Sequence, residues 1–213
     1  MNRIPSKKEM QEALKQRHGA FLQEKFSRSA VAVCGLGGLG SNIAFALARA
    51  GIGKLILIDF DRVDISNLNR QQYKASQTGM PKTEALTENL MEIAPYLAVS
   101  SHTVKLTENN AKTLLSDADI ICEAFDKAEE KAMLVNHTLE TMPEKYLIAA
   151  SGMAGLGSSN DIRTRKAAER FYLCGDNVSG TDCGMGLIAS RVMLCAAHQA
   201  HMALRILSGS YDI

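Results

Sequence analysis

A glycine-rich loop carries the clearest potential for chemistry in this sequence. Residues 35–40 read GLGGLG and match the pattern G-x-G-x-x-G, with glycines at Gly35, Gly37, Gly38 and Gly40. Glycines at these positions permit a tight turn and let backbone N–H groups reach a phosphate at the positive end of a following helix. The loop therefore indicates nucleotide binding, with a tight turn that holds no ligand as the alternative.

A carboxylate follows this loop at a position suited to a nucleotide's ribose. Asp59 ends the apolar run LILID. A carboxylate at the end of a strand can accept hydrogen bonds from ribose hydroxyl groups. The loop and this carboxylate together fit an NAD-dependent dehydrogenase as well as they fit an ATP-binding enzyme.

Two basic residues separate these two classes of protein. Arg70 ends the stretch DFDRVDISNLNR, and Lys82 follows it. A dehydrogenase needs no further cations aimed at phosphates, whereas a triphosphate carries more negative charge than the pyrophosphate of a dinucleotide. Arginine offers a planar fork for two phosphate oxygens, and lysine acts as a point charge. The pair favours ATP, with solvated surface charges as the alternative.

Taken together, these motifs resemble a known family. GLGGLG, then DFDxxDxSNLNRQ, then a PK pair that opens a helix are similar to the signature of the ThiF, MoeB and ubiquitin-activating superfamily. Asp59 and Arg70 are eleven residues apart, Arg70 and Lys82 twelve, and Lys82 and Asp126 forty-four. The motifs span residues 35–126, and the wider pattern covers about residues 30–208.

The resemblance implies a role for each motif position. The nucleotide-binding residues would be Gly35, Gly37, Gly38, Gly40, Asp59, Asp61, Asn67, Arg70 and Lys82. Asp59 would hold the ribose, and Asn67, Arg70 and Lys82 would contact the phosphates. Asp126 would help to hold Mg²⁺, and Arg70, Lys82 and Asp126 would form the catalytic set.

The activity that the resemblance implies is adenylation of a carboxylate. The C-terminal glycine of a ThiS-like sulfur-carrier protein would attack the α-phosphorus of ATP and expel pyrophosphate, in thiamine biosynthesis. Carboxylates are ionised near neutral pH, so the reaction needs positioning and charge neutralisation but no general base. The alternatives are a MoaD-like carrier in molybdopterin synthesis or a carrier in another sulfur pathway, a nucleotide-binding scaffold without catalysis, and an NAD-binding oxidoreductase.

The sequence departs from the family pattern at several points. Lys127 stands where the family usually has Asn after the magnesium aspartate, which leaves the geometry of metal binding open. The two CxxC pairs that bind zinc in many relatives are absent, so the chain resembles a short, zinc-free ThiF-like branch. Arg17 is the candidate for an arginine that reaches the nucleotide of a partner subunit, with Arg28 as the alternative and a surface role equally open.

Some cysteines and histidines have both a functional and a structural interpretation. Cys174 and Cys183, in YLCGDNVSGTDCGMG, are expected in a loop where a thiolate could take over the activated carrier, although packing is the favoured interpretation. The other cysteines are expected to be core residues; they are Cys34, Cys122 and Cys195. His198 and His201 are spaced like metal ligands, but without a nearby cluster they favour a structural role.

The elements that must position these residues follow from the hydrophobic pattern. Short apolar runs predict strands at 30–34, 55–59, 99–104, 120–124 and 146–150, and helical patterns are at 39–50, 82–93, 109–115 and 128–142. This alternation predicts a Rossmann-like α/β fold with a mostly parallel sheet covered on both faces. One domain over 1–213 is expected, with a helical arm (1–28), a nucleotide-binding core (29–150) and a crossover region with a long helix at 187–207 (151–213).

Composition narrows the possible partners. The chain has 213 residues, 46% of them apolar, and a net charge of +1 without a basic block, which argues against nucleic acid. It contains neither a long apolar stretch nor the apolar core of a signal peptide, so a cytoplasmic protein that does not enter membranes is expected. The resemblance favours a homodimer.

Overall fold

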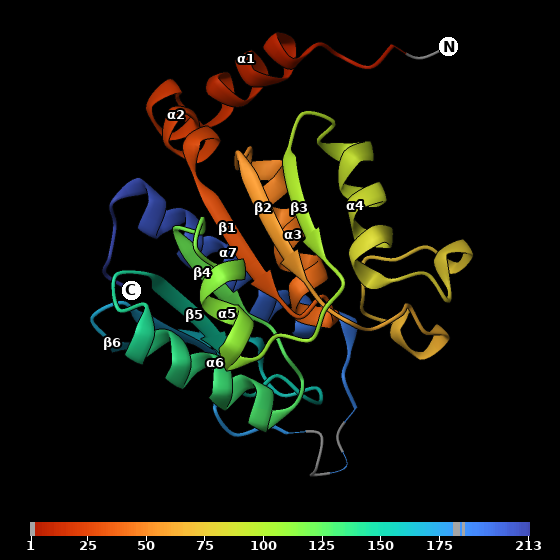
Figure 1. Ribbon diagram of the computed structural model, residues 1–213, viewed down its shortest axis with the longest axis vertical. Coiled ribbons are helices and arrows are strands. Elements are labelled where there is room, and N and C mark those ends of the chain that lie inside the picture. The colour runs from red at the N-terminus through yellow and green to blue at the C-terminus, as the bar shows by residue number, and fades with distance from the viewer. Residues whose placement is uncertain (1–2, 181–183, 185) are drawn as a thin grey trace.

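A seven-stranded sheet with the order β3-β2-β1-β4-β5-β7-β6 forms the centre of the protein (Figure 1). The structure is a computed structural model that describes residues 3–180, 184 and 186–213. The strands are β1 (Ala30–Cys34), β2 (Lys54–Ile58), β3 (Ala98–His102), β4 (Ile120–Glu123), β5 (Tyr146–Ala150), β6 (Arg163–Ala168) and β7 (Phe171–Gly175). The helices are α1 (Lys7–His18), α2 (Ala20–Arg28), α3 (Gly38–Ala50), α4 (Lys82–Ile93), α5 (Glu108–Leu114), α6 (Ala128–Thr141) and α7 (Ala189–Ser208), with short 3-10 turns at η1 (Ile65–Asn67), η2 (Ala75–Gln77) and η3 (Ser159–Asp161).

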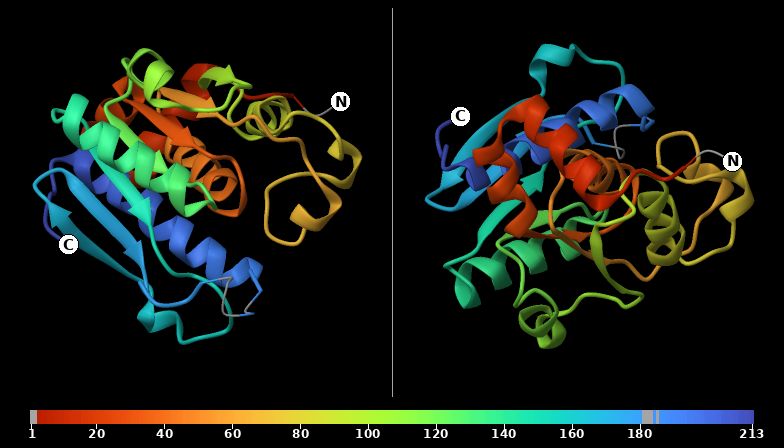
Figure 2. Two further views of the ribbon diagram at one scale, coloured as in Figure 1. Left: turned by 60° about the horizontal axis from the view of Figure 1, so that its bottom comes forward. Right: turned by 90° about the horizontal axis from the view of Figure 1, so that it is seen from above.

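Both faces of the central strands are buried. On β1, Val31 and Val33 belong to one hydrophobic cluster with side chains of α3, α4 and α7, whereas Ala32 and Cys34 belong to a second cluster with side chains of α5 and α6. Helices accordingly lie on both sides of the sheet (Figure 2). A parallel strand buried on both faces must be apolar throughout, and this is why the sequence shows continuous apolar runs. The predicted Rossmann-like α/β fold is confirmed.

Two strands were missed by the sequence pattern. β7 pairs in parallel with β5, and β6 returns antiparallel along the outer side of β7. β6 is one of the two edge strands of the sheet, and most of its side chains are exposed. It includes Arg163, Arg165 and Lys166, and charged residues are typical of edge strands because they oppose pairing with further chains. An exposed, charged strand has no apolar run, so hydrophobic patterning did not predict β6. The apolar run of β7, FYLC, is short and was not assigned to a strand.

The helical ends of the chain agree with expectation, with one difference. The arm predicted over residues 6–26 is divided into α1 and α2 at Gly19, whose φ of 90° lies in the left-handed region that favours glycine. The long helix predicted at 187–207 is α7. No helix within the described residues has both the length and the apolar character that crossing a membrane requires.

Candidate active site

The predicted glycine loop lies where the strand order reverses. β2 is on one side of β1 and β4 on the other, so the loops that follow these strands diverge and leave a crevice at their carboxyl ends. Gly35 has a φ of 90°, and a Cβ there would lie 2.7 Å from the carbonyl oxygen of Ala124. The loops after β1 and β4 therefore touch at the base of a cavity of about 1040 Å³.

The glycines divide into two functional groups. Gly35, Gly37 and Gly38 line the cavity, and Gly37 caps α3 without a side-chain hydrogen bond, so backbone N–H groups at the helix start face open space. Gly40 does not line the cavity. A Cβ at Gly40 would lie 1.8 Å from the carbonyl oxygen of Gly35, so this glycine allows α3 to pack closely against the loop.

Replacing Gly40 with alanine is expected to displace the loop. The added methyl group would meet backbone that cannot move without opening the turn, so we expect a loss of about 1–3 kcal/mol in the free energy of unfolding and weaker ATP binding. Urea denaturation and ATP titration measure the two effects. Gly186→Ala is the matched control because no atom of the described residues lies within 4 Å of its added Cβ. Equal stability of the two variants would contradict this packing role.

Asp59 connects the glycine loop to the end of β2. It is 7% exposed, and its carboxylate accepts hydrogen bonds from the backbone N–H groups of Leu36 (2.6 Å) and Asp61 (2.7 Å). Burial raises its pKa, opposed by the nearby Lys82 and by these two hydrogen bonds. Each carboxylate oxygen has two lone pairs, so the group can still accept a ribose hydroxyl at the cavity surface.

Positive charge lies on the same side of the cavity. Lys82, at the start of α4, has a side chain only 8% exposed, and its Nζ donates to Oδ2 of Asp61 at 2.9 Å. Arg70 donates from Nη1 to Oδ1 of Asn69 at 2.7 Å, and its aliphatic stem lies against Gly38. Together with Asn67 on η1, these side chains line the cavity and can contact phosphate oxygens.

Asp126 reaches the cavity from the loop after β4. It is exposed and lines the cavity, next to Lys127, whose Nζ lies 3.8 Å from Oε1 of Glu130. Among the described residues, no group of three His, Cys, Asp or Glu side chains could hold a metal by itself. Mg²⁺ typically binds through one or two carboxylates together with substrate phosphates, so Asp126 fits an ion that arrives with a nucleotide.

The cavity also contains residues to which the sequence analysis gave no role. Gln71 is 8% exposed and lines the cavity, and its Oε1 has no hydrogen-bond partner within the described part of the chain. Lys131 lines it too, and its Nζ lies 2.5 Å from Oε2 of the fully buried Glu123. Burial raises the pKa of Glu123, and Lys131 opposes that rise. The sequence contained a hint of both features. Gln71 ends the motif DFDxxDxSNLNRQ, and Glu123, the partner of Lys131, is a charged residue within an apolar strand.

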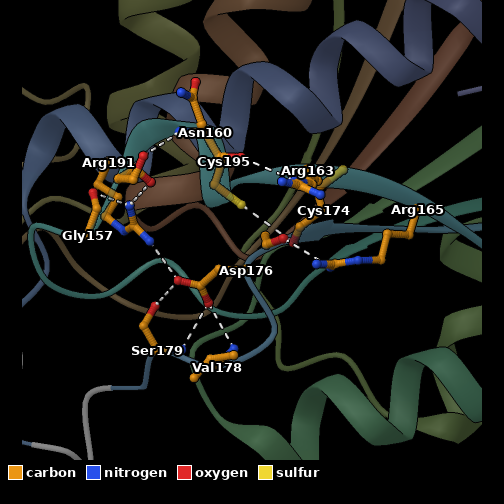
Figure 3. A network of polar contacts seen from close by, with 12 residues as sticks. Gly157, Asn160, Arg163, Arg165, Cys174, Asp176, Val178, Ser179, Arg191 and Cys195 are labelled. Atoms are coloured by element: carbon orange, nitrogen blue, oxygen red, sulfur yellow. Dashed lines mark hydrogen bonds and ion pairs between the residues drawn. The ribbon is translucent and has the colours of Figure 1, made fainter.

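The loop placement expected for Cys174 is wrong, whereas the favoured interpretation, packing, agrees with the structure. Cys174 (Figure 3) lies in β7 rather than in a loop and is fully buried. Its Sγ lies 3.5 Å from the hydroxyl of Thr164. Burial raises the pKa of Cys174 to about 11, so the reactive thiolate is scarce at neutral pH. Cys183 lies outside the described residues. The expected core cysteines Cys34, Cys122 and Cys195 are all buried.

Alkylation can test this assignment. We expect iodoacetamide near pH 7 to leave Cys174 unmodified in the folded protein, because the thiol is buried and protonated. Cys174→Ser should retain its ability to bind ATP, because the thiol does not line the cavity. Mass spectrometry of tryptic peptides and an ATP titration are the measurements. Rapid modification of Cys174 without unfolding would contradict its buried position.

The arginine and histidine candidates lie away from this cavity. Arg17 is exposed on α1, in the arm that packs near the far end of α3, where Gln23 donates to the carbonyl of Gly51. Arg28 pairs with Glu24. Neither lines the cavity of its own chain, and a role at a partner's cavity stays a prediction. The imidazole of His198 is hydrogen-bonded to Thr164, which agrees with a structural role.

Comparisons with known proteins agree with the predicted resemblance. The ThiF family model matches residues 9–212. The chain is 36% identical over 194 residues to adenylyltransferase and sulfurtransferase MOCS3 of Culex quinquefasciatus, covering 88% of this chain and 44% of that protein. It is 28% identical over 192 residues to molybdopterin-synthase adenylyltransferase of Escherichia coli (strain K12), covering 88% of this chain and 76% of that protein.

Solved structures share the fold. E. coli tRNA N6-threonylcarbamoyladenosine dehydratase, TcdA, in complex with ATP, superposes with a TM-score of 0.85 at 21% identity, over 97% of this chain and 98% of that one. A likeness at this identity concerns the fold alone. MOCS3 is more than twice as long as the stretch that this chain matches, since the chain spans 44% of it.

Proposed function

This chain belongs to the ThiF family, and on that premise we propose that it is an ATP-dependent adenylyltransferase that activates a carboxylate as an acyl-adenylate. One observation carries the proposal. Asp59, Arg70, Lys82 and Asp126 come from separate segments and meet at one cavity beside the start of α3. A bound ATP needs a carboxylate for its ribose, cations for its phosphates and a further carboxylate for Mg²⁺, and these four residues supply such groups.

The residues around the cavity suggest how the reaction is promoted. Backbone N–H groups at the start of α3 and the side chains of Arg70 and Lys82 would stabilise charge on the phosphate oxygens as the attacking carboxylate reaches the α-phosphorus. Asp59 would fix the ribose and so align the phosphate chain. Mg²⁺ held near Asp126 would neutralise further charge on the departing pyrophosphate. The attacking carboxylate is already ionised, so no base is required.

The substrate that we propose is the C-terminal glycine of a ThiS-like sulfur carrier, in thiamine biosynthesis. The support for this choice is the ThiF family model, which matches residues 9–212. A MoaD-like carrier is the second candidate, favoured by the similarity to the molybdopterin-synthase adenylyltransferase of E. coli. An NAD-dependent oxidoreductase has less support, because Arg70 and Lys82 face the same cavity as the glycine loop. A scaffold without catalysis would bind ATP but not turn it over.

We further propose a cytoplasmic homodimer. The support is that α7, which packs against α3 and the sheet, leaves Met193 (47% exposed) and Ala197 exposed on its outer face. Sedimentation of the purified protein tests the oligomeric state. A monomer at micromolar concentration would contradict the dimer and leave the activity untouched.

ATP–pyrophosphate exchange tests the activity directly. The purified protein, Mg²⁺, ATP and labelled pyrophosphate are incubated with single carriers that end in Gly-Gly, one ThiS-like and one MoaD-like. Exchange that depends on the ThiS-like carrier is the expected result. Exchange with the MoaD-like carrier alone would support the second candidate. ATP binding without exchange in any reaction would support the scaffold.

A further inference from the structure

A buried ion pair lies behind the side of the cavity that is formed by the loops after β5 and β7, away from the proposed nucleotide-binding residues. Arg191 is in the first turn of α7 and Asp176 directly follows β7, and Nη2 of the arginine lies 2.6 Å from Oδ2 of the aspartate (Figure 3). Their side chains are 5% and 10% exposed. Neither residue lines the cavity. The pair can therefore affect the cavity only by holding the loops that follow β5 and β7.

Arg191 holds the loop that follows β5. Its Nη1 donates to the carbonyl oxygens of Gly157 (2.6 Å) and Ser158 (2.7 Å). A Cβ at Gly157 would lie 3.1 Å from Nη2 of Arg191, so the glycine gives the guanidinium room. One arginine therefore fixes two successive carbonyl groups of a loop that has no strand or long helix of its own.

Asp176 holds the loop that follows β7. Its Oδ1 accepts from the N–H groups of Val178 and Ser179, both at 2.9 Å, and its Oδ2 accepts from the Ser179 hydroxyl at 2.7 Å. Burial disfavours the charged form, but these hydrogen bonds and Arg191 outweigh it and hold the pKa of Asp176 well below its usual range. The carboxylate is thus ionised at neutral pH and pairs fully with Arg191.

These two loops are joined to each other and form a wall of the cavity. The N–H of Asn177 donates to the carbonyl of Ser151 at 2.9 Å, and the N–H of Asp176 donates to that of Gly152 at 3.0 Å. A Cβ at Gly152 would lie 2.0 Å from Oδ1 of Asp176, so the two loops pack too closely here for any residue larger than glycine. Residues 151–154 and 177–180 line the cavity directly, and we call these two segments the acceptor wall.

The acceptor wall differs chemically from the nucleotide side. It carries no Lys, Arg, Asp or Glu, and beside it the cavity is lined by apolar side chains that include Val135, Phe171 and Leu173. Phosphates prefer the side with Arg70 and Lys82. A neutral wall suits an uncharged peptide segment that ends in the reacting carboxylate.

We propose that Arg191 and Asp176 are positioning residues that hold the acceptor wall where the C-terminal peptide of the carrier lies during adenylation. This inference rests on the proposed function for the identity of the peptide. Removing either charge leaves the other buried and unpaired, so the two loops would lose their common anchor. Misplacing the acyl end by about 1 Å can slow such a reaction on the order of 100-fold.

The test compares Asp176→Asn and Arg191→Gln with the wild type, since each substitution removes one charge of the pair. We expect the KM for the ThiS-like carrier in pyrophosphate exchange to rise roughly 10- to 100-fold, while the Kd for ATP, titrated without carrier, stays unchanged. Amide hydrogen exchange should become faster at residues 151–158 and 176–180 and stay as in the wild type on β1 and α3. Arg205→Gln, which breaks an ion pair with Asp212 further along α7, is the matched control and should change none of these values.

Each outcome is decisive. If Asp176→Asn keeps the wild-type KM for the carrier and the wild-type hydrogen exchange of both loops, the inference is overturned and the proposed function stands. An equal loss of carrier and ATP binding would also overturn it, because the pair would then support the whole fold. If the wild type shows no carrier-dependent exchange, the proposed function fails; faster hydrogen exchange confined to the two loops would then support the anchoring role, and its absence would overturn that role too.

Discussion

ATP–pyrophosphate exchange is expected to fall on the order of 1000-fold when Arg70 is replaced by alanine. The guanidinium is held in place by Asn69 and by the carbonyl of Ser66, and its stem packs on Gly38 at the start of α3. Both of these hydrogen bonds are donated by Nη1, so Nη2 remains as a donor for a ligand. A fixed cation at this point stabilises the transition state more than the bound substrate, because negative charge shifts toward pyrophosphate as the reaction proceeds.

Two further variants separate charge from geometry. Arg70→Lys should recover part of the exchange, because lysine keeps the charge and loses the planar fork. Arg49→Ala, which removes an exposed arginine from the last turn of α3, should exchange at the wild-type rate. The rates are measured with saturating ATP and carrier after circular dichroism has verified the fold. Wild-type exchange by Arg70→Ala would exclude this residue from catalysis.

The free energy of unfolding is expected to fall by about 3–5 kcal/mol when Lys131 is replaced by methionine. Its ammonium group is the partner of Glu123, whose side chain is fully buried at the end of β4. Without the lysine, the carboxylate must either remain charged in the protein interior or take up a proton. Both are costly near neutral pH. Urea denaturation, followed by circular dichroism, measures the loss.

The pH dependence identifies the carboxylate as the cause. Burial raises the folded-state pKa of Glu123 above its unfolded value, so its protonation favours the folded state at low pH and this benefit is lost as pH rises through the folded pKa. Losing Lys131 raises that pKa further. The destabilisation by Lys131→Met should therefore be larger at about pH 8 than at about pH 5. The double variant Lys131→Met/Glu123→Gln should recover most of the loss.

Lys127 provides the matched control for this experiment. It lies four residues earlier, its side chain is 55% exposed, and its nearest carboxylate atom is 3.8 Å away. Lys127→Met should change the free energy of unfolding by less than about 1 kcal/mol at either pH. If Lys131→Met were as mild as this control, the buried pair would not contribute to stability.

The sequence predicted most of the residues that lie together on one side of the cavity, because short-range patterns encode them, and the nucleotide roles assigned to them stay predictions. Glycines in a fixed pattern between an apolar strand and a helix define a local turn. A parallel sheet then brings its carboxyl ends to one edge, so Asp59 and Asp126, which follow β2 and β4, must converge. The phosphate-contacting roles of Arg70 and Lys82 were assigned from the family resemblance, because a sequence does not show whether a cation faces solvent or a cavity.

The opposite side of the cavity was beyond the sequence. β6 carries no apolar run and the run FYLC of β7 is short, so Cys174 was expected in a loop although it lies in the core. Nothing in a sequence relates Asp176 to Arg191, because the contact depends on how α7 packs after its connection from β7. Burial of Glu123 likewise depends on β5 and α6, which cover it from elsewhere in the chain.

The sequence by itself determined five of the seven strands, the helices around them, the glycine loop and the carboxylates and cations that could serve ATP. It could do so because backbone geometry and side-chain periodicity act over a few residues. Only the tertiary structure decided which polar groups are buried, which are paired and which face the cavity. Those properties depend on segments distant in the chain, whose contacts change the solvation and therefore the energy of each group.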